Sequence, residues 1–548
     1  MNPGFNLIDD PWILAQRHDG AVAALSLTEL FGDATEYARL VGDLPTQALP
    51  ILRLALAIMH QALDGPADEA AWAALWEAER LPAESISSYL DGYRPRFDLL
   101  HSTTPFYQVA DLTTKKTEAG LSAFIADVPT GNPKYTTRAA EGLRRIGFGE
   151  AARWLVHCQA FDLSGIKGAA DGDPRAKGGK SYPIGPGALG RLGAVYPEGD
   201  NVAQTLLLNL IPDAFLSRSG ADIVAEDVPV WERDPHGPAP EERRPESVPK
   251  GLRDLYTWQS RRLRLVFDDE GVTGALICQG DRLELRDQFA VEPMTAWRRS
   301  ENQERQLKSK QPVYLPRRHD PARNVWRGLA AALPALTGGP ANGDKAIAPL
   351  VTRWIGEAYS SGLLERGRRV GYHVSGAAYG TQEAVITDLI DDRLTVAAAV
   401  FDTGHRELAT AVAAAADDAE QAVKALAGFA RDLARAAGGH DNVDGAGATA
   451  AESAYAALDT AYRAWLAGLD PDTDTDRART GWQRTVRDTV LDIAARLAAA
   501  GGRAAWTGRK HGDYFLTSST AQHTFRRKLS RALPLTVPDP SPSEEAAR

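Results

Sequence analysis

Two glycine-rich motifs carry residue types that could bind a nucleotide. GPGALG at residues 185–190 matches the GxGxxG pattern of dinucleotide sites, and GGKS at residues 178–181 resembles a phosphate-binding loop. The first pattern needs a preceding strand and a following helix, but no strand–helix–strand alternation surrounds it. The second needs a glycine at the position where this chain has Pro174. A nucleotide-binding enzyme that uses the Gly-rich loop therefore stays as an alternative interpretation.

Other catalytic and metal-binding patterns are missing from the sequence. The 11 histidines are scattered, and the HD dipeptides at residues 18–19, 319–320 and 440–441 have no second group of metal ligands close by. Cys158 and Cys278 are the two cysteines, and they form no CxxC motif. A disulfide framework or a structural zinc site is therefore not expected, and a reducing compartment fits best. We expect no metal, no cofactor and no catalysis.

Basic residues gather in a chain that is acidic as a whole. The net charge is −10, yet the segment from Trp297 to Arg327 carries nine Lys or Arg against three acidic residues. Further cations lie in TWQSRRLRL, with Arg261, Arg262 and Arg264, and in the glycine-rich segment 164–200. Cations interleaved with Trp, Tyr and Gln suit a surface that contacts phosphates. A solvated face with surface ion pairs is the alternative.

The stretch AAYGTQEAVI at residues 377–386 raises a separate question. Gly380, Thr381, Gln382 and Glu383 stand between two apolar runs, which predicts a hairpin with Gly380 in the turn. A turn does not require glutamine at its tip, so Gln382 is either idle or directed at a ligand. Glu383 would repel a phosphate unless it faces away or pairs with an arginine.

The elements that position these residues fall into two regions. A length of 548 residues predicts more than one domain. Patterning predicts helices at residues 44–63, 68–79 and 137–160, strands at 261–268 and 274–279, and alanine-rich helices at 406–437, 451–467, 476–500 and 516–533. The expected fold class is α+β, with a large mixed α/β N-terminal domain at residues 1–395, a C-terminal four-helix bundle at 396–534 and a disordered tail at 535–548.

Composition predicts a soluble protein, with 44% hydrophobic and 24% charged residues. The most apolar segment, at residues 49–63, contains Arg53 and His60 and is too short to span a bilayer, so it predicts a buried helix. The first residues lack a basic stretch followed by an apolar core, so no signal peptide is expected. These features predict a cytoplasmic protein without a membrane partner.

Several longer motifs occur together in this chain. FNLIDDPWI at residues 5–13 and VGDLPTQALPILRLALAIMH at residues 41–60 form a specific pair. They are followed by PTGNPKY at 129–135, the glycine-rich segment ending in TLLLNL at 205–210, LYTWQSRRLRL at 255–265, the region of Trp326, and AYGTQ at 378–382. Over essentially its whole length the chain resembles the CasA family, the large subunits of the type I-E CRISPR surveillance complex, Cascade.

The resemblance implies a non-catalytic subunit. Such a subunit reads the protospacer-adjacent motif (PAM) of target double-stranded DNA from the minor groove. It then wedges open the duplex so that guide RNA–DNA pairing, and hence R-loop formation, can begin. The partners implied are target DNA, the CRISPR guide RNA, other Cascade subunits and the CRISPR helicase-nuclease. A purely structural scaffold subunit is the alternative within this class.

The resemblance also implies roles for particular residues. Gln382 matches a glutamine wedge, flanked by Gly380 and Thr381, and either Lys308 or Lys310 matches a lysine finger for the minor groove. A glycine loop against the PAM backbone falls within Gly178, Gly179 and Lys180. A segment that meets the guide handle and a neighbouring subunit falls on Gly131, Asn132, Pro133 and Lys134. Some relatives carry CxxC zinc ligands, which this chain lacks, so no metal is implied.

Overall fold

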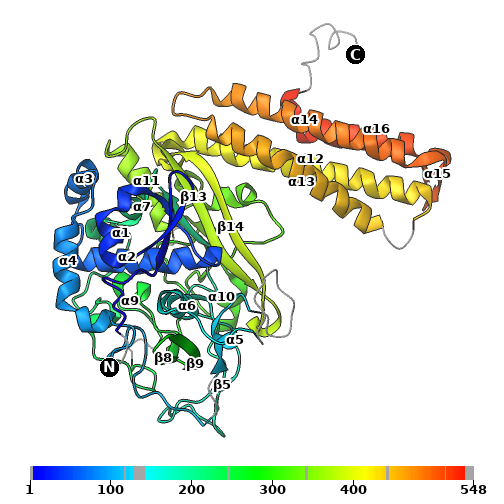
Figure 1. Ribbon diagram of the computed structural model, residues 1–548. Helices are drawn as coiled ribbons and strands as arrows, with labels where there is room; N and C mark the ends of the chain where they lie inside the picture. Colours follow the sequence, from blue (N-terminus) through cyan, green and yellow to red (C-terminus); the bar gives the residue numbers. More distant parts are fainter. Residues whose placement is uncertain are drawn as a thin grey trace. The chain divides into compact units, whose positions relative to one another are not determined.

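The computed structural model describes residues 4–115, 119–128, 142–242, 247–339, 343–439, 443–512 and 514–536 (Figure 1). The chain divides into two compact units. The first comprises Met1–Pro321, Thr337–Leu364 and Val370–Arg393, and the second comprises Ala322–Leu336, Glu365–Arg369 and Leu394–Arg548. The sequence predicts one boundary at residue 395. That boundary would assign the segments 322–336 and 365–369 to the N-terminal domain, whereas their contacts assign them to the second unit.

The first unit mixes helices with small antiparallel sheets. Its helices are α1 (Leu27–Gly32), α2 (Ala48–Ala62), α3 (Glu69–Glu77), α4 (Ala83–Gly92), α5 (Leu121–Phe124), α6 (Phe148–Phe161), α7 (Val202–Asn209), α8 (Asp213–Arg218), α9 (Leu252–Tyr256), α10 (Glu301–Leu307) and α11 (Leu350–Ser360). Helix α2 is apolar on all sides and is buried from Ala48 to His60, as its sequence predicts. None of the helices in the described ranges is long and apolar enough to cross a membrane.

Helix α6 begins later than its sequence pattern predicts. The expected helix covered residues 137–160, but residues 142–147 are not helical. Ile146 instead exchanges backbone hydrogen bonds with Val272, of 3.0 and 2.9 Å, and Arg145 pairs with Asp268 and Glu270. Pairing with a strand keeps this segment extended, so the helix starts only at Phe148. A tertiary contact therefore overrides the local helical pattern.

The strands form small sheets. The sheets of three strands have the orders β2-β1-β3, β4-β9-β8, β14-β13-β7 and β11-β10-β12. Their strands are β1 (Ile13–Arg17), β2 (Val22–Leu25), β3 (Tyr37–Leu40), β4 (Ala119–Gly120), β7 (Ala194–Glu198), β8 (Arg261–Asp268), β9 (Gly271–Gln279), β10 (Trp297–Arg299), β11 (Tyr314–Pro316), β12 (Ala346–Ile347), β13 (Arg369–Tyr379) and β14 (Ile386–Ala397). Strands β8 and β9 confirm the strands predicted there. The long pair β13 and β14 stands out in Figure 1.

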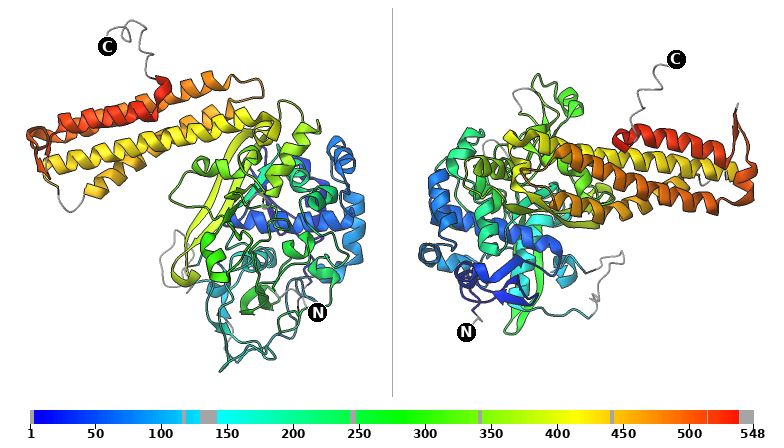
Figure 2. Two further views of the ribbon diagram at one scale, coloured as in Figure 1. Left: turned by 180° about the vertical axis from the view of Figure 1, so that it is seen from behind. Right: turned by 90° about the horizontal axis from the view of Figure 1, so that it is seen from above.

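The C-terminal part of the second unit is helical. Helices α12 (Arg406–Ala437), α13 (Val443–Ala467), α14 (Thr475–Ala500) and α16 (Ser518–Ala532) lie side by side, and α12 packs against the other three (Figures 1 and 2). Small buried side chains such as Ala415, Ala419 and Ala422 repeat along α12 at helical spacing and allow close approach. A short helix α15 (Gly502–Thr507) and the hairpin β15 (Arg509–His511) and β16 (Tyr514–Leu516) precede α16. The expected α+β class with a four-helix bundle is confirmed.

One upstream segment completes this second unit. Trp326 is fully buried and stacks on Tyr462 with ring centroids 4.5 Å apart. Its indole N–H donates to a carboxylate oxygen of Asp459 over 3.0 Å, and the Asn324 amide donates to the same oxygen over 2.9 Å. Arg327 lies over the ring of Tyr455. The segment around Trp326 is therefore part of the core of the helical unit.

Candidate nucleic-acid interface

The tip of the β13–β14 hairpin presents Gln382 to solvent. Residues Thr381–Glu383 form a single tight turn in which Gln382 (φ 58°) and Glu383 (φ 56°) both adopt left-handed backbone conformations. Such conformations are uncommon for residues other than glycine and cost about 1–3 kcal/mol each. The Gly380 N–H donates to the carbonyl of Val385 over 2.8 Å and closes the turn. The backbone strain is thus placed at the residue expected to act as the wedge.

Two hydrogen bonds brace this tip from behind. The Tyr379 hydroxyl donates to the carbonyl oxygen of Phe161 over 2.8 Å. The backbone N–H of Ser164 donates to the carbonyl oxygen of Glu383 over 2.9 Å. The turn is therefore fixed to the end of α6 and to the start of the glycine-rich segment.

Glu383 pairs with two arginines. Its carboxylate accepts from Arg191 and from Arg318, with a closest distance of 2.7 Å to each. Burial raises the pKa of Glu383, but the two guanidinium groups outweigh it, so the pKa lies below the ordinary value for glutamate. Of the two arrangements that the sequence left open for this carboxylate, pairing with arginine is the one observed.

An open pocket of about 660 Å³ lies beside the tip. It is lined by Ser164, Pro183, Ile184, Gly185, Arg191, Arg282, Arg318, Gln382 and Glu383. Three arginines from separate chain segments thus meet next to the exposed glutamine. Sequence reasoning placed Arg318 in a basic run but missed Arg191 and Arg282, because each is an isolated arginine whose neighbours in the pocket are distant in sequence.

Gly178, Gly179 and Lys180 lie in a separate hairpin. Strands β5 (Lys167–Gly168) and β6 (Lys180–Ser181) pair, and Lys177 and Lys180 exchange backbone hydrogen bonds of 2.9 and 3.2 Å. Gly178 (φ 57°) and Gly179 (φ 71°) form its two-residue turn, in which both positions need left-handed backbone. A Cβ at either glycine would meet open space. The turn therefore needs glycine for its conformation rather than to avoid a clash within the chain.

Lys308 and Lys310 follow helix α10. Both are exposed, and Lys308 ends the helix with a left-handed backbone (φ 51°). The side chain of Ser300 caps the start of this helix, and an Arg299–Glu304 ion pair of 2.8 Å braces it. Neither lysine is among the residues that line the pocket beside Gln382. The structure therefore brings the glutamine and the arginines together and leaves both lysines outside that group.

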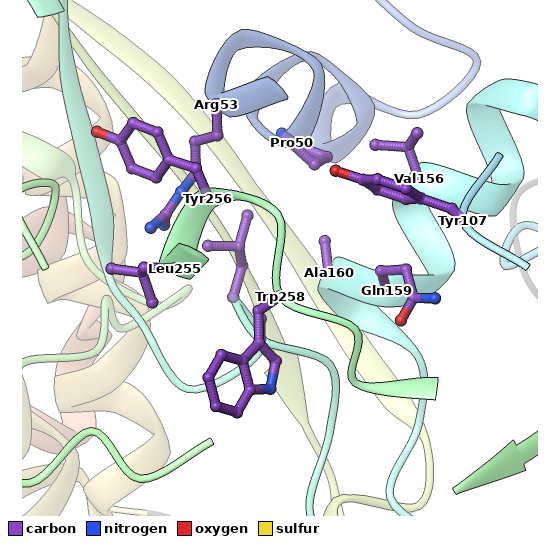
Figure 3. Close-up of a pocket in the computed structure, with 11 residues that line it drawn as sticks. Pro50, Arg53, Tyr107, Val156, Gln159, Ala160, Leu255, Tyr256 and Trp258 are labelled. Atoms are coloured by element: carbon purple, nitrogen blue, oxygen red, sulfur yellow. The ribbon is translucent and has the colours of Figure 1, made fainter. Parts of the chain in front are cut away.

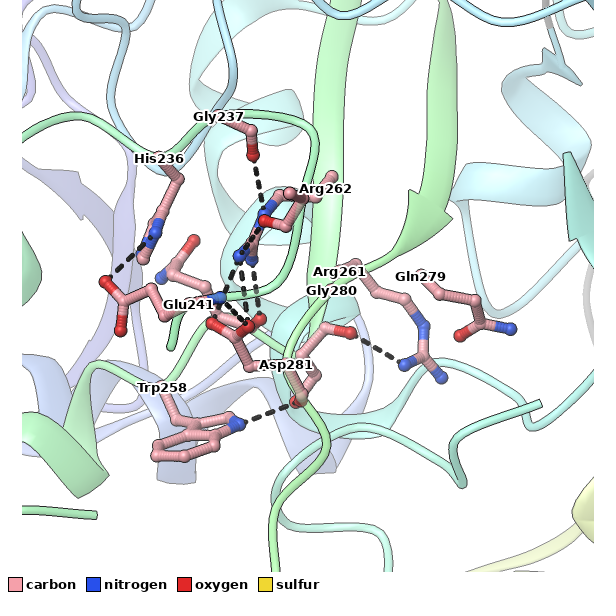
Figure 4. Close-up of polar contacts among 12 residues, drawn as sticks. His236, Gly237, Glu241, Trp258, Arg261, Arg262, Gln279, Gly280 and Asp281 are labelled. Carbon is pink, nitrogen blue, oxygen red and sulfur yellow. Dashed lines mark hydrogen bonds and ion pairs between the residues drawn. The ribbon is translucent and has the colours of Figure 1, made fainter. Parts of the chain in front are cut away.

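Much of the basic sequence does not form a phosphate-contacting surface, which corrects that interpretation. Arg261 and Arg262 are each only 1% exposed. Arg261 pairs with Asp162 and donates to the carbonyl oxygens of Leu163 (3.1 Å) and Gly185 (2.8 Å), so it ties together the glycine-rich segment. Figure 4 shows Arg262 with its partner Asp281.

The long basic run is also partly neutralised. Arg323 and Arg327 both pair with Glu420 in the helical unit, and Arg299 pairs with Glu304. For these three arginines, the structure therefore agrees with the alternative interpretation, a solvated face with surface ion pairs. The cations that face the pocket are a small subset of the basic residues in the sequence.

Comparison with known proteins assigns the family. The family model for CRISPR-associated protein Cse1 matches residues 6–493. The chain belongs to the Cse1 family. A crystal structure of Thermobifida fusca Cse1 has 43% sequence identity and a TM-score of 0.89, and the match covers 98% of this chain and 99% of that one.

Two further comparisons extend this result. A curated CRISPR-associated protein CasA/Cse1 of Thermus thermophilus is 31% identical over 340 residues, and the match spans 61% of each protein. A chain of a CRISPR RNA-guided surveillance complex, at 17% identity and a TM-score of 0.67, shares the fold, with 91% of this chain and 99% of that chain covered. The resemblance to CasA is therefore confirmed.

The glycine motifs of this Cse1-family chain do not form nucleotide sites. GPGALG leads into strand β7 rather than into a helix, and GGKS is a hairpin turn. A Cβ at Gly187 would lie 2.4 Å from the backbone of Ala160, and one at Gly190 would lie 2.7 Å from the Tyr379 hydroxyl. These two glycines allow the segment to pack closely against α6 and the β13–β14 hairpin.

One cluster has metal-ligating residue types. Ligand atoms of His236, Glu241 and Asp281 lie within 4.8 Å of one another (Figure 4). Arg262 donates to Asp281 over 3.1 Å, and Arg233 donates to Glu241 over 3.0 Å. Because arginines already neutralise both carboxylates, the donor set does not fit a cation. Sequence spacing gave no sign of this cluster, since Asp281 is distant along the chain.

A partly open pocket beside α2 has a volume of only about 30 Å³, which leaves room for little more than water. Arg53 lines this pocket together with Tyr256 (Figure 3), and its guanidinium lies over the Tyr256 ring at 4.5 Å. The same guanidinium pairs with Glu292 at 2.7 Å.

The residues Gly131, Asn132, Pro133 and Lys134 lie outside the described residues.

Proposed function

We propose that this Cse1-family chain is the non-catalytic large subunit of a type I-E CRISPR surveillance complex. In this role it recognises the PAM of target double-stranded DNA through the minor groove and opens the duplex beside it. One observation carries the proposal: Gln382 stands exposed at the tip of a hairpin that Tyr379 and Glu383 brace, next to a pocket lined by arginines.

The chemistry of the minor groove suits such a reader. The groove presents similar acceptors on most bases, and only the guanine amine adds a donor. A long, thin lysine can enter it and donate to these acceptors, which is the role proposed for Lys308 or Lys310. Gly178 and Gly179, with Lys180, would meet the DNA backbone, since their turn carries no Cβ and their Cα atoms face open space.

Opening the duplex requires a rigid wedge. Unstacking a base step costs a few kcal/mol, which an inserted side chain can offset. The Gln382 amide can stack on a displaced base and hydrogen-bond to it, while Gly380 and Thr381 complete the turn. A braced tip favours insertion because little conformational entropy is lost when DNA arrives.

The proposed function also implies which molecules this chain binds. The guide RNA reads the target sequence by base pairing, as in other RNA-guided effectors, so this chain reads only the PAM. Gly131, Asn132, Pro133 and Lys134 would meet the guide handle and a neighbouring subunit. Other Cascade subunits and the helicase-nuclease complete the assembly, which we place in the cytoplasm.

Binding of the reconstituted complex to matched duplexes with and without a PAM tests the proposal. We expect much tighter binding to the duplex that contains a PAM. Equal affinity for the two duplexes would overturn PAM recognition. If complexes that lack this chain still discriminate, the subunit is a structural scaffold instead.

A further inference from the structure

The carboxylate of Glu383 occupies a site with the geometry of an anion clamp. Arg191 donates from Nε to both carboxylate oxygens over 3.3 Å and from Nη2 to Oε2 over 2.7 Å. Arg318 donates from Nη2 to Oε1 over 2.7 Å. Forked guanidinium groups bind carboxylates and phosphates in the same manner. The two arginines are thus arranged as they would be around a phosphate.

This clamp is accessible from the pocket. The side chains of Arg191 and Arg318 are 40% and 47% exposed. Arg282 lines the same pocket and is paired at 3.9 Å with Glu284, so it adds a third arginine beside the two that hold Glu383. Gly185 (φ 111°) lies against Arg191, and a Cβ there would come within 3.0 Å of the guanidinium group. A side chain at this position would therefore crowd the guanidinium group of Arg191.

The side chain of Glu383 can leave the clamp without release of the tip. The backbone of Glu383 is held separately, by the Ser164 N–H on its carbonyl oxygen and by its own N–H, which donates to Gly380 over 3.0 Å. Rotation of the side chain breaks neither bond. An incoming anion could therefore replace the carboxylate while Gln382 stays in place.

We infer that this pocket binds a phosphodiester group of the DNA strand that Gln382 displaces, and that Glu383 is an internal substitute for that phosphate. The inference rests on the proposed function, because it requires DNA to open beside Gln382. DNA is the chosen source because Gln382 lines the same pocket as the three arginines. In the absence of DNA, Glu383 keeps the arginines paired and limits their attraction for other polyanions.

The test compares salt dependence in complexes reconstituted with Glu383→Gln. In the wild type an incoming phosphate must displace the Glu383 carboxylate, whose negative charge stays close to the DNA, whereas in the variant no carboxylate competes for the arginines. We expect Glu383→Gln to strengthen binding to PAM duplex about two- to fivefold at low salt, the range for a partly exposed ion pair. Because Glu383→Gln makes the pocket more positive by one charge, the slope of log K against log salt should steepen, by at most roughly 1. Arg318→Gln should change both quantities in the opposite direction.

A matched control separates this effect from a general change in charge. Glu69→Gln removes a carboxylate from another arginine pair, with Arg218, which does not line the pocket. It should leave the slope unchanged. A tip merely loosened by substitution would weaken binding in both Glu383→Gln and Arg318→Gln, and that result would overturn the inference.

Neutral linkages identify the source of the phosphate. Methylphosphonates placed one at a time in the displaced DNA strand next to the PAM should abolish the gain of Glu383→Gln at one or two positions. A gain that persists at every position overturns the assignment to that strand. Another outcome is that the wild-type complex discriminates PAMs while Glu383→Gln and Glu69→Gln show the same slope of log K against log salt. That result overturns phosphate binding in the pocket but leaves the proposed function intact. Loss of PAM discrimination in the wild type overturns the proposed function itself.

Discussion

The hydroxyl group of Tyr379 lies 2.8 Å from the carbonyl oxygen of Phe161, so the last residue of β13 is bonded to the last residue of α6. This contact spans a large separation in sequence and lies directly behind the turn that carries Gln382. Gly190 is packed against the same hydroxyl, where a Cβ would lie 2.7 Å away. The position of the turn that carries Gln382 thus depends in part on this phenol oxygen and on the absence of a side chain at Gly190.

Tyr379→Phe should loosen the tip. It leaves the Phe161 carbonyl without this donor, so we expect a loss of about 1–2 kcal/mol in the free energy of unfolding. Urea denaturation measures this loss, and hydrogen exchange should show faster exchange at Gly380 and Glu383. Tyr182→Phe is the control, because Tyr182 is 66% exposed. Unchanged exchange at the tip in Tyr379→Phe would show that this bond does not brace the turn.

Gln382→Ala should separate duplex opening from PAM binding. We expect association with PAM duplex to be nearly unchanged, while strand separation slows about tenfold, equivalent to about 1.4 kcal/mol of lost stabilisation. The fluorescence of 2-aminopurine beside the PAM reports opening. Gln382→Asn keeps an amide and tolerates the left-handed backbone, so it should retain part of the rate. Wild-type kinetics in Gln382→Ala would remove the wedge role.

Charge removal at Lys308 and Lys310 should weaken PAM binding. Lys308→Asn suits the left-handed backbone at that position, and Lys310→Gln preserves side-chain length. The double variant should lower affinity for PAM duplex and reduce the salt slope by roughly 1–2. The double variant Lys424→Gln and Lys528→Gln, on α12 and α16, is the control because it removes the same two charges. A slope equal to that of the control would place the lysine finger elsewhere.

The turn at Gly178 and Gly179 should be sensitive to conformation alone. Gly178→Ala and Gly179→Ala introduce a Cβ into open space, so each should destabilise the hairpin by about 1–2 kcal/mol through its left-handed backbone. Asparagine at the same positions should be better tolerated. Hydrogen exchange at Lys177 and Lys180 measures the effect. Equal protection in the alanine and asparagine variants would contradict this explanation.

His373 should make stability depend on pH. Its ring lies 2.9 Å from Glu198 on β7 and 2.7 Å from Asp391 on β14, so it connects the three strands of the sheet β14-β13-β7. Burial lowers the pKa of His373, but its two carboxylate partners outweigh it and raise the pKa to about 9.

The sign follows from the raised pKa. The stabilisation from protonated His373 is complete when the pH is below about 6.5, the pKa of histidine in the unfolded chain. It is lost as the pH rises through about 9, the pKa of His373 in the folded protein. We expect the unfolding free energy to fall by about 2–3 kcal/mol across that window, measured by urea denaturation at a series of pH values. His373→Gln should flatten the curve. A variant with the same pH dependence as the wild type would assign the effect to another group.

The sequence was most informative where local pattern and fold agree. Alanine periodicity predicted α12 and α14 almost to the residue, and the apolar runs on either side of Gly380 predicted the β13–β14 hairpin. Residues 142–147 were predicted to be helical but are not, because Ile146 pairs with Val272 in a strand that is distant in sequence.

Arginines were the least predictable residues. A guanidinium group carries the same charge in every setting, and only the fold decides its partners. Arg261 and Arg262 are buried in ion pairs, whereas the isolated Arg191 and Arg282 line the pocket beside Gln382. Local clustering of basic residues therefore did not predict which arginines lie beside Gln382, and the role that the family resemblance implies for Gln382 stays a prediction.

The location of Trp326 has a consequence for how the helical unit can be inherited. Its partners Asp459 and Tyr462 lie more than a hundred residues downstream, so no single continuous piece that begins after β14 contains the whole core. A recombination event near residue 394 between diverged relatives would join one parent's tryptophan to the other parent's pocket. The two halves of this packing must therefore change together, and chimaeras made at that junction should work best when both parents share the residues that surround Trp326.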